Sequence, residues 1–283
     1  MPIRPDDAAA AMEASPALGE SLCAYAGREL RHARQCLSWR QAWLHRGVHQ
    51  GRKSLRRVRA TLALAAAALG RSGQIVDAEL QRINRSLSDL RDGHALVEAI
   101  ERLAALEHSA EHAASLRRAR AAATRRRVEL GQHARADGAR DDTDVVLRML
   151  QAGIKALPWR SLHDADVLHA LADSERRTES AGQRATRADE DDDWHRWRRR
   201  ARRLSQQQRA LERSPLSVRM AGDAFKKLAV LLGEVQDFSL LADHCGARSP
   251  FADADRRLLR ELADAEVRRL RTRLHETIAP PAD

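Results

Sequence analysis

Hydrophobic positions recur at steps of three and four residues along much of the chain. Between about residues 44 and 70 they include Leu55, Val58, Leu62, Ala65 and Leu69. This spacing places apolar side chains on one face of an α-helix. We therefore expect an amphipathic helix here, with that face buried in a core.

The same spacing returns in the second half of the chain, with one polar interruption. Its positions are Trp194, Trp197, Ala201, Leu204, Gln208 and Leu211. We expect a second amphipathic helix that repeats the first.

Prolines are few, and the intervals between them are rich in residues with high helix propensity. The sequence therefore predicts an all-α fold of long antiparallel helices, four in each half. The expected helices cover about 17–41, 44–70, 74–105 and 107–134, then 143–156 with 161–188, 190–213, 216–245 and 250–278. We expect a flexible N-terminal tail over 1–16, then one domain over 17–283 with halves at about 17–136 and 142–279. The polar stretch Asp137–Asp144 is the expected linker.

The composition indicates a folded protein with an acidic partner. Hydrophobic residues make up 43% of the chain, and the formal net charge is +10. Most cations are arginines, whose planar fork binds phosphate oxygens in pairs. A GC-rich genome also produces arginine-rich chains, so the positions of the arginines matter more than their number. Aromatic residues are only 3%, fewer than base-stacking surfaces need.

Cysteine usage and hydropathy point to the cytoplasm. Cys23, Cys36 and Cys245 are far apart and show no metal-ligand or redox spacing. We see no apolar segment of signal-peptide type, and the run Leu62–Leu69 is too short to cross a bilayer. We expect a cytoplasmic protein with no membrane contact and no bound cofactor or metal.

A basic pattern occurs twice. His49-x2-Arg52-Lys53-x2-Arg56-Arg57 returns 146 residues later as His195-x2-Arg198-Arg199-x2-Arg202-Arg203. Farther along, Leu87–Asp92 aligns with Leu232–Asp237 at an offset of 145. The agreement in order and spacing predicts an internal repeat.

Each basic pattern lies along one side of its helix, beside the apolar face. Like charges three and four positions apart repel, which weakens the helix unless anions bind it. No acid occurs between His49 and Leu69 or between His195 and Leu211. A solvated charged face remains the alternative, although such a face usually carries glutamates as well.

These residues resemble the CHAD domain, the conserved histidine α-helical domain, whose two halves each carry a helix of the form H-x2-R-x3-[RK]-[RK]. The resemblance covers about Leu18 to Ile278. It implies two four-helix bundles related by a pseudo-twofold axis, with basic helices facing a shared groove that binds inorganic polyphosphate at polyphosphate granules. Ser205-Gln206 stands where the family usually has Arg-Tyr, so we expect the two halves to contribute unequally.

We therefore expect a non-enzymatic module with no catalytic residue. The candidate polyanion-binding residues are His49, Arg52, Lys53, Arg56, Arg57, Arg59, Arg82, His195, Arg198, Arg199, Arg202, Arg203, Lys226 and Lys227. His49 and His195 fit ligand binding and packing equally well. Asp92 and Asp237 are expected to hold arginines or cap helices.

Three further patterns have two interpretations each. The acidic run Asp189–Asp193 most simply complements a helix N-terminus, although it could also compete with a polyanion. His108-x2-Glu111-His112 matches a zinc-hydrolase pattern, but without an evident third ligand we interpret it as a solvated helix face. The basic charge would serve a sequence-nonspecific nucleic-acid-binding protein equally well, and a granule-coating scaffold is a third reading.

Overall fold

The computed structural model describes residues 16–106, 109–136, 139–212, 214–216, 224–247 and 249–278. Every regular element within these ranges is a helix, which confirms the all-α prediction for them. None of the described helices is long and apolar enough to cross a membrane. The expected tail lies outside the described ranges, except for Pro16, which begins the first helix.

The chain divides into two compact units. One unit consists of Met1–Leu87 and Ala139–Lys226, and the other of Ser88–Gly138 and Lys227–Asp283. Each unit takes helices from both halves of the sequence. The compact units therefore differ from the expected halves, and the arrangement of one four-helix bundle per half stays a prediction.

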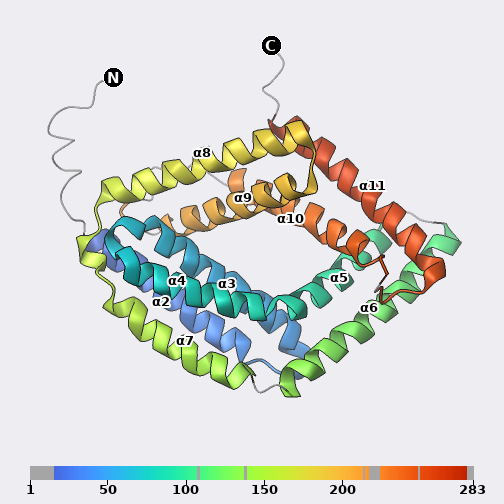
Figure 1. The fold of residues 1–283 in the computed structure, drawn as a ribbon, viewed down its shortest axis with the longest axis horizontal. Helices are drawn as coiled ribbons and strands as arrows, with labels where there is room; N and C mark the ends of the chain where they lie inside the picture. The colour runs from blue at the N-terminus through green and yellow to red at the C-terminus, as the bar shows by residue number, and fades with distance from the viewer. Residues whose placement is uncertain are drawn as a thin grey trace, which may run out of the picture. The chain divides into compact units, whose positions relative to one another are not determined.

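The first unit contains six α-helices and two short 3-10 helices within its described residues (Figure 1). They are α2 (Pro16–Leu37), η1 (Gln41–Trp43), α3 (Leu44–Leu64), α4 (Ala66–Ser86), α7 (Ala139–Ala156), η2 (Trp159–Ser161), α8 (Asp164–Ala188) and α9 (Asp191–Leu211). Helix α2 packs along α3, and α8 packs along α9. The two pairs meet where α3 contacts α9, while α7 and η2 pack on α2.

The predicted apolar faces form the core of this unit. Every position of the first pattern is buried, from Leu55 in α3 to Leu69 in α4. In α9 the second pattern is buried throughout, including Gln208. Both sequence predictions of an amphipathic helix are confirmed.

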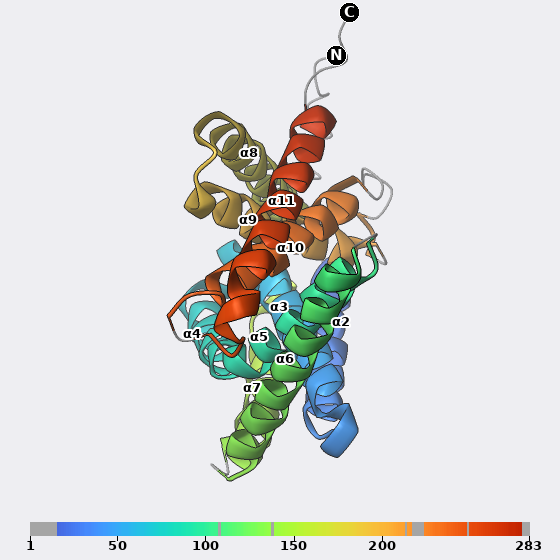
Figure 2. The ribbon, with the colours of Figure 1, turned by 90° about the vertical axis from the view of Figure 1, so that its right-hand side faces the viewer.

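The second unit contains α5 (Ser88–Ala104), α6 (Ala110–Ala136), most of α10 (Ala224–Asp243) and α11 (Asp253–Ile278). Helix α5 packs along α6, and α6 contacts α11 (Figure 2). An ion pair of 2.9 Å joins Arg102 of α5 to Asp237 of α10, and Arg118 of α6 pairs with Asp255 of α11. The expectation that Asp237 holds an arginine is confirmed.

Three helix boundaries differ from the predictions. The boundary expected near residue 70 is present as a break at Gly70 within α4, where the backbone is not helical. The helix expected over 44–70 also breaks earlier, at Ala65, and the helix expected over 74–105 breaks at Leu87. Neither position carries the proline or glycine that usually marks a helix end. The expected linker is helical from Ala139 onward, because its polar residues form the first turns of α7.

Close packing of α2 on α3 depends on Gly47, since a Cβ atom there would collide with the carbonyl oxygen of Cys36. We expect Gly47→Ala to lower the free energy of unfolding by about 1–3 kcal/mol through overpacking, measured by urea denaturation. Gly153→Ala in α7 is the control, because no atom lies within 4 Å of its added methyl group. That variant should gain up to about 1 kcal/mol from helix propensity; equal effects of both substitutions would contradict the prediction.

Candidate functional site

Helices α3 and α9 carry the two copies of the basic pattern, and they contact each other within the first unit. Because the apolar faces of both helices are buried, the adjacent basic stripes lie at the edges of this contact. The structure thus brings together most of the predicted residues. On α3 these are His49, Arg52, Lys53, Arg56, Arg57 and Arg59, and on α9 they are His195, Arg198, Arg199, Arg202 and Arg203.

Arg202 lies at the centre of this arrangement. Burial, and after it the positive charges of Arg198, Arg52, Arg199 and Arg59, together lower the pKa of its guanidinium to about 9. Two of these neighbours belong to α9 and two to α3. We call Arg52, Arg59, Arg198, Arg199 and Arg202 the arginine cluster. Among the described residues, the Arg202 guanidinium has neither a hydrogen-bond partner nor an ion-pair partner.

Such a cluster raises the free energy of the folded state when no anion is bound. Like charges repel most strongly where water is partly excluded, because the effective dielectric constant is lower there. An anion placed among the guanidinium groups removes this repulsion and accepts their hydrogen bonds. The cluster is therefore chemically suited to hold several negative charges in a row.

A second group of cations surrounds Lys53. Burial lowers the pKa of its ammonium, and Arg57, Arg209 and Arg56 lower it further, while Glu29 raises it. Arg209 comes from the last turn of α9 and was missed in the sequence because it lies outside the repeated pattern. Positive charge therefore gathers on both helices at this place too.

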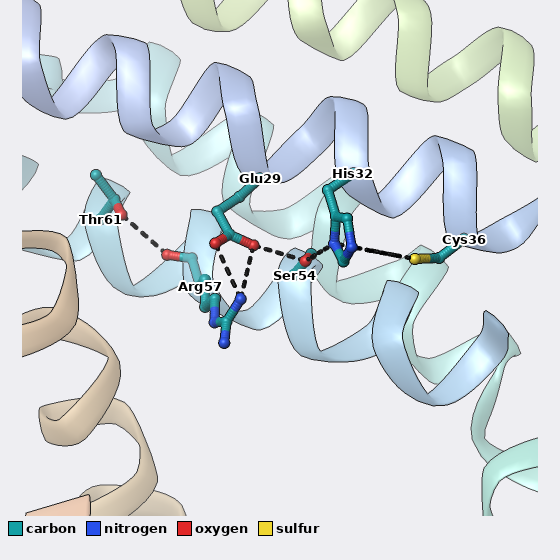
Figure 3. Close-up of polar contacts among 6 residues, drawn as sticks. All are labelled: Glu29, His32, Cys36, Ser54, Arg57 and Thr61. Carbon is teal, nitrogen blue, oxygen red and sulfur yellow. Dashed lines mark hydrogen bonds and ion pairs between the residues drawn. The ribbon is translucent and has the colours of Figure 1, made fainter. Parts of the chain in front are cut away.

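A carboxylate from α2 neutralises Arg57 (Figure 3). Its Nη1 donates to both oxygens of Glu29, at 3.0 and 3.1 Å. The hydroxyl of Ser54 also donates to Glu29, at 2.6 Å, so His32 Nδ1, at 2.9 Å, must donate to the Ser54 oxygen. This leaves His32 Nε2 to accept from the thiol of Cys36 at 3.5 Å, whose pKa is raised by burial.

Arg59 also has a carboxylate partner, supplied by α4. It donates to both oxygens of Asp77, at 2.8 and 2.9 Å, and to the amide oxygen of Gln81 at 3.0 Å. Arg203 lies in the field of the same carboxylate: burial lowers its pKa most, Asp77 raises it, and Arg59 lowers it again. Arg57 and Arg59 are thus held by acids that the local sequence pattern does not contain.

The remaining predicted cations lie elsewhere. Arg82 is exposed on α4 and pairs with Glu79 of its own helix at 2.6 Å. Lys226 and Lys227 are exposed in the first turns of α10. The half-buried histidines His49 and His195 lie on the two basic helices, and their role stays a prediction.

The acidic run lies at the start of α9, where Asp191, Asp192 and Asp193 occupy the first turn. Carboxylates there favour the helix electrostatically. No capping hydrogen bond comes from the side chain of Glu190, the residue before the helix, so the run acts through charge rather than through that cap. Asp193 also pairs with Arg196 at 3.0 Å.

The zinc-like pattern gains no support within the described residues. His108 lies outside them, whereas Glu111 and His112 lie in the first turn of α6. The described part of the chain holds no group of three or more His, Cys, Asp or Glu residues that could bind a metal ion.

Glu29→Gln tests the role of the carboxylate beside Arg57. We expect the free energy of unfolding to fall by about 3 kcal/mol, because Arg57 would stay largely buried without its counter-charge. Urea denaturation measures this. Glu20→Gln is the control on the same helix. Because the ion pair of Glu20 with Arg160 is exposed, this substitution should lower the free energy of unfolding by less than about 1 kcal/mol. Equal losses of unfolding free energy in the two variants would show that the Glu29–Arg57 pair stabilises the fold no more than the exposed pair does.

Arg202→Met should stabilise the protein in the absence of ligand. At pH 7 we expect a gain of roughly 1–2 kcal/mol in the free energy of unfolding, because a pKa shift of one unit corresponds to about 1.4 kcal/mol. Above about pH 9 the unfolded chain holds this proton more firmly than folded wild type does, so wild-type stability recovers and the gain shrinks. Thermal unfolding at pH 7 and pH 10 checks this, with Arg196→Met as control. A less stable variant at pH 7 would refute the expectation.

Comparison with known proteins agrees with this architecture. Residues 24–246 match the CHAD domain family. The crystal structure of the CHAD domain from the plant Ricinus communis has the same fold, with a TM-score of 0.66 and 18% identity over 93% of each chain. PptA from Streptomyces chartreusis has a TM-score of 0.64 and 21% identity, over 93% of this chain and 99% of its own. No curated protein matches. Because the family match spans well over half of the sequence, the chain belongs to the CHAD domain family.

Proposed function

We propose that the basic surface shared by α3 and α9 binds inorganic polyphosphate without chemical conversion. The observation that carries this proposal is the position of Arg202 among four other guanidinium groups from both helices. Membership of the CHAD family, which is known as a polyphosphate-binding type, supports it.

Polyphosphate suits this surface because it repeats one negative charge along a flexible chain. Arginines at steps of three and four residues present a row of forks, each able to take two oxygens. Arg202 and Arg203 have no ion-pair partner among the described residues, whereas Arg57 and Arg59 already do. Arg202 and Arg203 therefore offer more available charge than Arg57 and Arg59, although the stripe of α9 is one charge shorter because Ser205 follows it.

Reversing one charge on each helix tests the proposal. We expect Arg56→Glu combined with Arg202→Glu to weaken polyphosphate binding at least a hundredfold by calorimetry, since two attractive contacts become repulsive. Wild-type affinity should fall with salt, with a log–log slope of roughly 0.7 per neutralised phosphate, and the variant should show a smaller slope. Circular dichroism verifies that its helicity is unchanged.

Arg184→Glu combined with Arg187→Glu is the matched control. Both residues are exposed on α8, and this double substitution changes the net charge by the same amount. If both double variants lose affinity equally, general charge rather than the α3–α9 surface governs binding. Unchanged affinity in the first variant would place the site elsewhere.

Nucleic acid is the alternative ligand, and competition separates the two. Contacts to phosphate alone do not read sequence, so DNA or RNA binding here would be nonspecific. We expect duplex DNA and RNA to displace polyphosphate poorly at equal phosphate concentration. Displacement with equal efficiency would favour the nucleic-acid function, and poor displacement would agree with a protein that associates with polyphosphate granules.

A further inference from the structure

A small cavity lies beside the arginine cluster in the first unit, where α8 and α9 meet the junction of α3 and α4. Its volume is about 260 Å³. The polar residues that matter in its lining are His169, Asp173, Arg177, Arg200, Arg203 and Gln207. Of these, only Arg203 belongs to the repeated basic pattern, so no sequence motif groups the others.

The cavity carries an excess of positive charge. Burial lowers the pKa of Arg200, and so do the charges of Arg177 and Arg199. Asp173 is the one carboxylate in the lining, and it already pairs with Arg177 at 2.7 Å and with Arg176 at 3.4 Å. Within the described residues, Arg200 and Arg203 make no ion pair. An anion in the cavity would supply a counter-charge for Arg200 and Arg203.

Gln207 provides a second and independent sign of a ligand. Its side chain lines the cavity although the residue is only 1% exposed, and its Oε1 has no hydrogen-bond partner among the described residues. Leaving such a buried amide oxygen unsatisfied destabilises the folded state. The occupant should therefore offer a hydrogen-bonding group as well as negative charge.

The volume of the cavity limits the kinds of molecule that could occupy it. A single water has a share of liquid volume of roughly 30 Å³, so the cavity is too large to be explained by one bridging water. It lies slightly below the range of about 300–1,000 Å³ that is typical of sites for larger organic ligands. Its volume is compatible with a small and highly charged group, and the charge of the lining favours one.

We propose that this cavity binds the terminal phosphate of a linear polyphosphate chain, with Arg200, Arg203 and Gln207 as its ligands. The inference rests on the proposed function and deepens it. An internal unit of the chain has one ionised oxygen and no hydroxyl. The terminal unit has a further ionisable oxygen, whose proton leaves at a pKa of roughly 6 in a phosphate monoester. It therefore offers two negative charges, or one charge and a P–OH donor.

Gln207 can serve either form of the terminal phosphate. Its Oε1 accepts from the P–OH of the monoanion, and a half-turn of the amide lets Nε2 donate to the dianion. Continuity with the arginine cluster supports the assignment, because Arg59 lies in the electrostatic field of both Arg202 and Arg203. The body of the chain then follows the cluster while its end lies in the cavity.

Ligands with and without chain ends test this assignment. Linear triphosphate has two terminal units among three, cyclic trimetaphosphate has none, and in long-chain polyphosphate the ends are a negligible fraction. We expect Gln207→Met and Arg200→Gln each to weaken linear triphosphate roughly tenfold by calorimetry, the loss of one hydrogen bond to a charged group. Binding of cyclic trimetaphosphate and of long chains should change less than about twofold.

Gln208→Met and Arg196→Gln are the matched controls. Gln208 is a buried amide next to Gln207, and Arg196 lies on the same helix, but neither lines the cavity. Both controls should leave triphosphate affinity unchanged. Equal losses for linear and cyclic ligands, no loss for either, or binding of long chains without any binding of triphosphate would each overturn the chain-end assignment alone. If wild type binds none of the three ligands, the proposed function itself fails.

Discussion

Packing of α3 against α9 is the constraint on which the rest of the site depends. The core requires both helices to bury their apolar faces, and large side chains such as Leu55 of α3 and Trp197 of α9 are fully buried. Each such burial contributes about 1.5–3 kcal/mol, enough to hold the neighbouring guanidinium groups together against their repulsion. The hydrophobic core thus fixes Arg202 beside Arg52 and Arg59. Charge density at this surface follows from the packing beneath it.

Acids from neighbouring helices then decide which cations stay available. Glu29 of α2 holds Arg57, and Asp77 of α4 holds Arg59. These pairs make two of the pattern's arginines part of the framework, whereas Arg202 has no acidic partner in the part of the chain that the structure describes. Members of one sequence motif therefore differ in function because their tertiary neighbours differ. The sequence motif alone does not distinguish the paired arginines from Arg202.

The sequence predicted the features that depend on the spacing of hydrophobic and charged residues. Spacing predicted the buried faces of α3 and α9, and the repeated basic pattern indicated the family. The breaks at Ala65 and Leu87 were not predictable, because local propensity there favours a continuing helix and tertiary packing overrides it. Contacts between distant segments were equally hidden, as with Arg34 and Asp144, which are 110 residues apart. The position of Gln207 in the cavity lining follows from the packing of α8 against α9, which the sequence pattern does not reveal.

The first unit is assembled from two segments separated by residues 88–138, and this separation matters while the chain is being made. Helix α3 ends at Leu64, but α9 is complete only at Leu211. At synthesis rates of about 5–20 residues per second, the interval is roughly 7–30 seconds. Throughout it, the nascent protein displays the basic stripe of α3 without its partner helix, close to a ribosome rich in RNA phosphate. The basic stripe of α3 is therefore exposed to RNA phosphate before the helix that shares its surface has been made.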